Sequence, residues 1–372
     1  MTDRRKRQNP GLSVIVSPVL IIVSLNLFAQ EQPDCTISRK GSLNAYPYAF
    51  YTPETELAFG GGGILTFYTA NDADLRPSKM TLSGYYSTKG QYQFTVGPEV
   101  YFDVNKYFIS ASLDFGRYVD RFYGIGNDTP DIDNVDFDSR VFGADLNFQL
   151  PSLFHLSYRS GIIYDFSYND VIDKKDNPYL LSGNIRGSEG GFASGLGLIW
   201  VYDTRDHIFF PNNGGFHQVK AVFYSDAIGS DFDFNKYELD VRRYIAVAPD
   251  HVFAFQIYGS MVRGSPPFYE LPALGGQNRM RGFYQGRFRD KNYLTGQVEY
   301  RAYLWWRIGM VAFIGIGDVS EGVHDFRLRN FKSSYGFGVR FKFNEAEKVN
   351  LRMDLGFGKG TSGIYFGIEE VF

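Results

Sequence analysis

The sequence predicts an all-β fold, a transmembrane antiparallel β-barrel of about 16 strands. Three observations predict it. Long segments alternate between apolar and polar residues, which is the period of a strand whose two faces meet different surroundings. The chain holds 35 Phe, 27 Tyr and 41 Gly, a composition that favours strands, tight turns and aromatic residues at a membrane interface. After one N-terminal apolar run no second run is long enough for a spanning helix, so any further spanning segment must be a strand.

The segment 91–103 shows the alternation most clearly. Strands of soluble β-sandwiches alternate as well, but they average about 5–6 residues, whereas the alternating segments here extend over about 10–13. The polar parity also carries charges of both signs, which suits a lumen lined by ion pairs and water. In this segment the apolar parity is Tyr92, Phe94, Val96, Pro98, Val100 and Phe102, and it faces away from Gln91, Gln93, Thr95, Gly97, Glu99, Tyr101 and Asp103.

Strand-like segments can be assigned along most of the chain, with the longest internal loop before the last five. Single-chain bacterial barrels nearly always have an even number of strands, so one more strand is expected, at 45–51 or at 118–125, and the pattern does not choose between them. The glycine run 60–63 is interpreted as a kink in the first strand. The assigned segments are 57–69, 79–87, 91–102, 106–116, 137–149, 153–166, 193–202, 215–225, 234–246, 250–261, 293–304, 305–316, 333–343, 347–357 and 361–372.

The N-terminus has the features of an export signal. Arg4, Arg5, Lys6 and Arg7 precede an apolar run that ends at Ala29, so residues 1–29 are predicted to be a secretory signal peptide, with a single transmembrane anchor as the alternative. Residues 30–54 are expected to be a short periplasmic segment and 55–372 the barrel domain. Export and a strand-built membrane domain together predict the outer membrane of a Gram-negative bacterium.

Composition and motifs argue against several other functions. The formal net charge of −3 gives no basic surface for nucleic acid. No Gly-x-Ser-x-Gly motif occurs and no nucleophile motif accompanies the five histidines. We therefore expect neither an enzyme nor a bound cofactor. Five aspartates between 128 and 138 lack the glycine and glutamate of a calcium loop, which favours a solvated surface loop.

The most informative motif is Gly275-Gly276-Gln277-Asn278-Arg279-Met280-Arg281-Gly282-Phe283, which precedes a strand containing Gln297-Val298-Glu299-Tyr300-Arg301. In these residues the chain resembles the BamA/TamA superfamily of outer-membrane barrels, also called the bacterial surface-antigen family. The stretch 202–214, with Asp203, Arg205 and Phe210-Pro211, looks like the family's Asp-Arg and Phe-Pro-x-x-Gly hairpin. Together these matches extend over roughly 55–372, and their combination is more specific than any one of them.

The resemblance implies roles for several residues. It implies that the loop 271–292 folds into the lumen, that Arg281, Gly282 and Phe283 form its tip, and that Arg281 contacts the inner wall. Because a desolvated unpaired guanidinium is costly, Arg281 needs a carboxylate, and Glu299 on the inward parity is its best available partner. The alternative is an ordinary lumenal ion pair. The resemblance also implies that the last strand, with Gly367 and an aromatic Phe372 at the barrel rim, is an assembly signal.

The chain departs from the family pattern at Gly315, where the family has an aspartate that would be a second partner for the arginine. Asp318 lies near in sequence, but its odd separation from Gly315 puts it on the opposite face of a regular strand. Half of the usual lumen contact is therefore expected to be missing. The short segment before the first strand further suggests a minimal member without the family's periplasmic receptor domains.

The resemblance implies a role in inserting or translocating outer-membrane proteins or lipid through a weak contact between the first and last strands. The alternatives are a passive pore or transport channel and a barrel subunit of a larger envelope complex. Expected partners are outer-membrane lipids, the barrel assembly machinery that inserts the chain itself, and a periplasmic accessory protein or a client outer-membrane protein.

Overall fold

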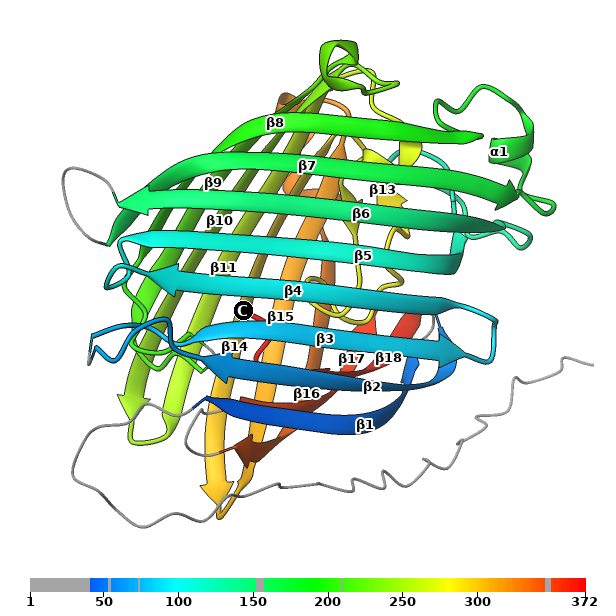
Figure 1. Ribbon diagram of the computed structural model, residues 1–372. Coiled ribbons are helices and arrows are strands. Elements are labelled where there is room, and N and C mark those ends of the chain that lie inside the picture. The colour runs from blue at the N-terminus through cyan, green and yellow to red at the C-terminus, as the bar shows by residue number, and fades with distance from the viewer. Residues whose placement is uncertain (1–40, 53–54, 73, 152–156, 209, 345–348) are drawn as a thin grey trace, which may run out of the picture.

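The computed structural model describes residues 41–52, 55–72, 74–151, 157–208, 210–344 and 349–372. The wall is one antiparallel sheet of sixteen strands. The sheet curls into a nearly closed barrel (Figure 1). The predicted signal peptide 1–29 and the single cysteine of the sequence, Cys35, lie outside the described residues. The wall strands follow chain order: β1 Ser42–Thr52, β2 Glu56–Phe67, β3 Ser78–Ser87, β4 Tyr92–Phe102, β5 Tyr107–Arg121, β6 Asp136–Pro151, β7 Tyr158–Asp173, β8 Gly190–Asp203, β9 Gly214–Tyr224, β10 Phe234–Ala248, β11 His251–Gly264, β14 Asn292–Trp305, β15 Ile308–Ser320, β16 Lys332–Asn344, β17 Val349–Gly358 and β18 Thr361–Ile368.

The two faces of the wall differ as the alternation predicts. On the outward parity apolar side chains are exposed, and Leu198, Ile314 and Phe337 are 61%, 62% and 52% exposed. On the inward parity polar side chains such as Asp240, Gln256 and Gln297 are buried. Apolar residues outside and polar residues inside are the reverse of the arrangement in a soluble protein. A lipid-facing cylinder requires this, because its outer surface meets hydrocarbon and its lumen holds the polar groups.

Most ends of the assigned strands agree with the structure to within a few residues. The additional strand is β1, the first of the two candidates. The second candidate, 118–125, extends β5 to Arg121 and forms no separate strand. The boundary placed between a periplasmic segment 30–54 and the barrel at 55 is therefore wrong, because residues 42–52 pair along their length with β2.

The glycine run 60–63 lies in β2, where the ladder to β1 continues in register, so the predicted kink in a first strand is wrong. Its glycines instead leave room for tyrosine rings on β1. A Cβ atom added to Gly62 would lie 2.9 Å from the hydroxyl of Tyr46, and one added to Gly60 would lie 2.8 Å from the ring of Tyr48. The tyrosines of β1 therefore pack across the strand pair onto backbone.

Long connections gather at one end of the barrel and short ones at the other. The long end holds 122–135, 174–189 and 265–291, and the short end holds 103–106, 249–250 and 306–307. Phe122, Phe137, Leu180 and Phe268 pack together at the long end and link three of the connections that meet there. The helices lie in connections: α1 Pro178–Leu181, η1 Asp226–Ile228, η2 Phe268–Glu270, η3 Val323–Asp325 and η4 Leu328–Asn330. Within the described ranges no helix has the length and apolar character to cross a membrane.

The barrel has one unsealed seam, between β1 and β18. These strands are the two ends of the sheet and lie beside each other. Every other neighbouring pair of wall strands forms a ladder, but among the described residues no ladder joins β1 to β18. The backbone donors and acceptors on the facing edges of these strands are therefore not used by the sheet.

The last four residues leave the wall and enter the lumen. β18 ends at Ile368, and Glu369 has a left-handed backbone conformation with φ of 65°. The chain end lies inside the barrel in Figure 1, and Phe372 packs against Tyr244, Val252 and Ala254 from the inner wall. The predicted strand 361–372 with Phe372 at the rim is therefore wrong, because the turn at Glu369 directs the segment inward.

Candidate functional site

The connection 265–291 between β11 and β14 folds back into the lumen, as the resemblance implies. It contains a small antiparallel pair, β12 Ala273–Leu274 and β13 Phe288–Arg289. Its apolar residues form a cluster with inward side chains of the neighbouring wall strands, and this packing fixes the loop against β11, β14 and β15. The cluster comprises Tyr258, Leu274, Met280, Phe283, Tyr293 and Val319.

Arg281 at the loop tip is fully buried and lies between two carboxylates. Its Nη2 atom forms an ion pair with Glu299 of β14, the partner predicted from the sequence, and its Nη1 atom lies 2.6 Å from Oδ2 of Asp354 of β17. The guanidinium also lies over the ring of Phe313, with Cζ 3.6 Å from the ring centroid. The two carboxylates and the aromatic face replace the favourable hydration that the guanidinium loses when it is buried.

Gly282 and Phe283 are each needed in the motif for a different structural reason. Gly282 has φ of 108°, and a Cβ there would lie 2.5 Å from the carbonyl carbon of Phe357, so only glycine lets the loop lie directly on β17. Its N–H donates to the hydroxyl of Tyr365 at 2.9 Å. The ring of Phe283 covers Gly358, where an added Cβ would lie 2.7 Å from it. All three motif residues thus fasten the loop to the last strands.

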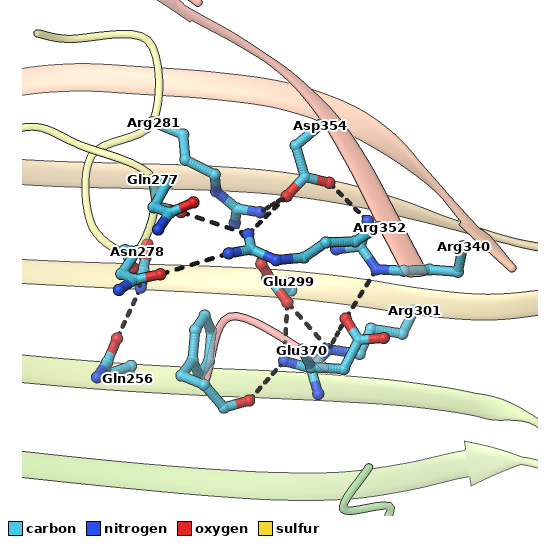
Figure 2. A network of polar contacts seen from close by, with 12 residues as sticks. Gln256, Gln277, Asn278, Arg281, Glu299, Arg301, Arg340, Arg352, Asp354 and Glu370 are labelled. Carbon is cyan, nitrogen blue, oxygen red and sulfur yellow. Dashed lines mark hydrogen bonds and ion pairs between the residues drawn. The ribbon is translucent and has the colours of Figure 1, made fainter. Parts of the chain in front are cut away.

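The ion pairs of Arg281 belong to a larger buried network, shown in Figure 2. Arg301 contacts Glu299 at 2.8 Å, and Arg340 contacts Asp354 at 2.6 Å. Arg352 contacts Asp354 at 3.2 Å and reaches the main-chain oxygen of Gln277 in the loop at 3.4 Å. Glu370 of the inward-turned tail is the third carboxylate, 2.8 Å from Nε of Arg340. The network therefore joins the lumen loop, three wall strands and the end of the chain.

The expectation that half of the lumen contact is missing is wrong. Gly315 provides no carboxylate, but Asp354, two strands further along the wall, provides one. A Cβ at Gly315 would lie 3.5 Å from Sδ of Met280 and 3.2 Å from Oγ of Ser334, so this glycine faces the loop near its tip. Asp318 forms an ion pair of 2.9 Å with Lys332, not with Arg281. Asp354 lies on the inward parity of its strand, but nothing in sequence spacing relates it to the loop.

Gly367 and Phe372, the residues expected to mark the assembly signal, both lie at this network. A Cβ at Gly367 would lie 2.5 Å from Nε of Arg352, so the glycine leaves room for that side chain. Nη2 of Arg301 donates to the main-chain oxygen of Phe372 at 2.8 Å. The role of these residues as an assembly signal stays a prediction.

The predicted Asp-Arg and Phe-Pro hairpin forms the connection between β8 and β9. Arg205 binds Asp203 at 3.0 Å, and Arg76 binds the same carboxylate at 3.2 Å. Phe210 is buried, and its ring meets that of Tyr303 edge-on at 5.5 Å. These contacts stabilise the short-loop end of the barrel.

The last two aspartates of the aspartate-rich segment 128–138 lie at the start of β6 and pair with cationic side chains. Asp136 binds Arg121 at 3.0 Å, and Asp138 binds Arg117 and Lys175, each at 2.7 Å. Among the residues that the structure describes, no group of three or more His, Cys, Asp or Glu side chains is arranged to hold a metal ion.

The sequence matches the Omp85 superfamily domain over residues 76–372. The chain belongs to the Omp85 superfamily. This agrees with the resemblance drawn from the Arg-Gly-Phe loop, and Omp85 proteins of the BamA type are outer-membrane β-barrels of Gram-negative bacteria. The outer membrane protein assembly factor BamA of Nitratidesulfovibrio vulgaris is 24% identical over 237 residues, which cover 62% of this chain and 28% of that protein. The chain thus spans less than a third of this relative.

Solved structures of Omp85 barrels have the same fold. BamA from Haemophilus ducreyi lacking POTRA domains 1–3 aligns with a TM-score of 0.57 and 11% identity, covering 94% of this chain and 75% of that one. CdiB from Acinetobacter baumannii aligns with a TM-score of 0.57 and 12% identity, covering 94% and 65%. At these identities the agreement concerns the architecture of the barrel.

Proposed function

We propose that this Omp85 barrel resides in the outer membrane of a Gram-negative bacterium and assists the insertion or translocation of outer-membrane proteins or lipid. It acts without catalysis of a chemical step. The observation that carries the proposal is the seam, where β1 and β18 lie side by side without a ladder between them. The likeness to an assembly factor of the BamA type supports the same role.

The seam suits this role for a physical reason. In hydrocarbon each unsatisfied backbone N–H or C=O group costs several kcal/mol, about the free energy of a strong hydrogen bond. An open strand edge at membrane depth therefore favours any partner that supplies a complementary edge. A client strand in extended conformation does this by adding to the sheet. The same local defect disturbs the packing of neighbouring lipids. This lowers the free-energy barrier for a client to enter the membrane from the periplasm.

A passive pore is the alternative function, and the occupied lumen argues against it. The loop 265–291 is fastened across the interior by Arg281, and an aromatic cluster packs the connections at the long-loop end. Outer-membrane lipids and the machinery that inserts the chain itself are the proposed partners. A separate periplasmic accessory protein, or a complex in which this chain is the barrel subunit, would supply client delivery.

A cross-link across the seam tests the proposal. Because the edge strand is β1, the cysteine pairs must join Ala45 or Ala49 of β1 to Ile364 or Phe366 of β18. In a Cys35→Ser background, the readout is the rate at which a urea-unfolded outer-membrane barrel protein folds into liposomes that contain this protein. We expect oxidation to abolish the acceleration and reduction to restore it.

A matched control places the same cross-link in a closed part of the wall. Leu65 of β2 and Met80 of β3 are partners in a continuous ladder, so Leu65→Cys with Met80→Cys adds a disulfide where no opening is required. This variant should keep full acceleration when oxidised. Equal activity of the oxidised seam variants and the reduced protein would refute the proposal.

A further inference from the structure

The residues that follow β18 occupy a site built into the inner wall. We infer that the inner faces of β10, β11, β14 and β16, with Asn350 of β17, bind a short peptide segment that carries a carboxylate two residues before an aromatic side chain. Glu370, Val371 and Phe372 of this chain fill that site in the structure. An equivalent segment of a second polypeptide is the ligand that would compete for it.

The carboxylate half of the site is formed by three buried polar side chains. Oε2 of Glu370 lies 2.8 Å from Nε of Arg340 and 3.8 Å from Nε of Arg301. Nδ2 of Asn350 donates to Oε1 of the same carboxylate at 2.9 Å. Both guanidinium groups are about 2% exposed, and the Glu370 side chain is 1% exposed. Buried donors on two sides of one carboxylate form a specific receptor for it.

The aromatic half of the site is an apolar recess in the same wall. Phe372 is 4% exposed and packs against Tyr244, Val252 and Ala254. Arg301 borders this recess as well, because its Cζ atom lies 5.3 Å from the ring centroid of Phe372 and its Nη2 atom donates to the main-chain oxygen. One arginine therefore contacts both the carboxylate and the aromatic residue, which sets the spacing that the site recognises.

The site can be vacated without leaving a buried cation unpaired. Arg301 also binds Glu299, and Arg340 also binds Asp354. Lys79, which lies 3.5 Å from Glu369, also lies 3.3 Å from Glu99. Each cation that holds the tail thus has a second carboxylate on the wall. The large cost of breaking a buried ion pair comes from the charge left behind, so these contacts limit the cost of releasing the tail. The four guanidinium groups of the network then share only Glu299 and Asp354, so the vacated site favours a ligand that brings a carboxylate.

The wall also offers unused hydrogen-bond donors beside the site. Among the described residues, Nη1 of Arg301 and Nη2 of Arg340 are buried without a hydrogen-bond partner. A bound segment with one more oxygen nearby would satisfy them. The left-handed conformation of Glu369 is unfavourable for a residue with a side chain, so the docked tail is held by its contacts and not by its own backbone preference.

Docking of the tail has a consequence for the seam, and this consequence rests on the proposed function. The turn at Glu369 takes the end of the chain away from the edge of β18 and into the lumen. A competing segment in the site would release residues 369–372, which could then extend β18. The site therefore couples occupancy of the lumen to the length of the edge strand that is available beside β1.

Peptide binding to the barrel tests the site directly. A variant that ends at Ile368 leaves the site empty, and the probe is a fluorescently labelled peptide with the sequence of residues 365–372, measured by anisotropy in detergent. We expect saturable binding to the shortened barrel, at least tenfold weaker binding of a peptide carrying Phe372→Ala or Glu370→Gln, and at least tenfold weaker binding to the full chain. Equal binding of the three peptides, as pairing with the open β1 edge would give, would overturn the inference.

A second variant retains the whole chain in case the shortened one does not fold. The full-length double variant Glu370→Gln with Phe372→Ala weakens docking of the tail but keeps its length, and it should bind the unmodified peptide. Absence of peptide binding to a folded variant of either kind would also overturn the inference. Neither measurement depends on insertion activity, so failure here is distinguishable from failure of the seam cross-link.

Discussion

Arg281 and Asp354 are 73 positions apart in the chain, yet their side chains form an ion pair of 2.6 Å in which both are fully buried. This contact fastens the lumen loop to β17, one strand from the seam. Glu299, the other partner of Arg281, lies on β14. The loop tip therefore links the strand that follows the loop to a strand beside the open edge.

Arg281→Ala should destabilise the barrel. Removing one partner of a buried ion pair typically costs about 3–5 kcal/mol, and here the value should be near 3 because Glu299 retains Arg301 and Asp354 retains Arg340. The melting temperature of the detergent-solubilised barrel, read from heat-dependent mobility on gels, measures the effect. Arg140→Ala is the matched control, since its pair with Asp170 is exposed and its loss should cost less than about 0.5 kcal/mol.

Asp354→Asn should be more harmful than Arg281→Ala. This carboxylate is shared by Arg281, Arg340 and Arg352, so its neutralisation leaves three buried guanidinium groups with too little compensating charge, at a cost of about 4–5 kcal/mol. The same melting experiment should place this variant below Arg281→Ala. The reverse order would show that Asp354 is not the centre of the network.

The contrast between Glu299 and Asp354 shows what sequence can predict of such a site. Glu299 was predictable because it follows the loop closely and lies on a parity that the alternation shows to be inward. Asp354 lies on an inward parity as well, beside Arg352, but which inward carboxylate meets the loop depends on the path of the loop through the lumen. That path is set by packing of Met280 and Phe283 against the wall, which no local pattern encodes.

Gly282→Ala should loosen the loop. An alanine at φ of 108° is strained by about 1–2 kcal/mol, and its Cβ would also displace the loop from Phe357 of β17. Hydrogen–deuterium exchange of residues 275–291 should become faster. Gly360→Ala is the control, because Gly360 also has a positive φ, of 72°, but open space around it. If both variants leave exchange in the loop unchanged, contact with β17 does not hold the loop in place.

The strands were predictable because lipid outside and a polar lumen inside impose a strict alternation over long segments. The sequence does not identify β1 as the additional strand, because polarity does not separate the two faces of this segment. Its inward side chains are aromatic, Tyr46, Tyr48 and Phe50, and its outward Ala45 and Pro47 are small. The chain end was mispredicted for a different reason. Phe366, Ile368 and Phe372 share one apolar parity that only Glu370 interrupts, and Glu369 turns the backbone without a glycine or proline to mark the turn.

Electrical conductance separates the proposed function from a passive pore. In planar bilayers the purified protein should pass little steady current, because the loop and its ion pairs obstruct the lumen and Phe122, Leu180 and Phe268 pack the connections at the long-loop end. Arg281→Ala removes the anchor of the loop tip, so it should increase the fraction of time that the channel conducts, whereas Arg140→Ala should behave as the unmodified protein. A large steady current through the unmodified protein, unchanged in Arg281→Ala, would favour the pore and would mean that the loop does not obstruct the lumen in a membrane.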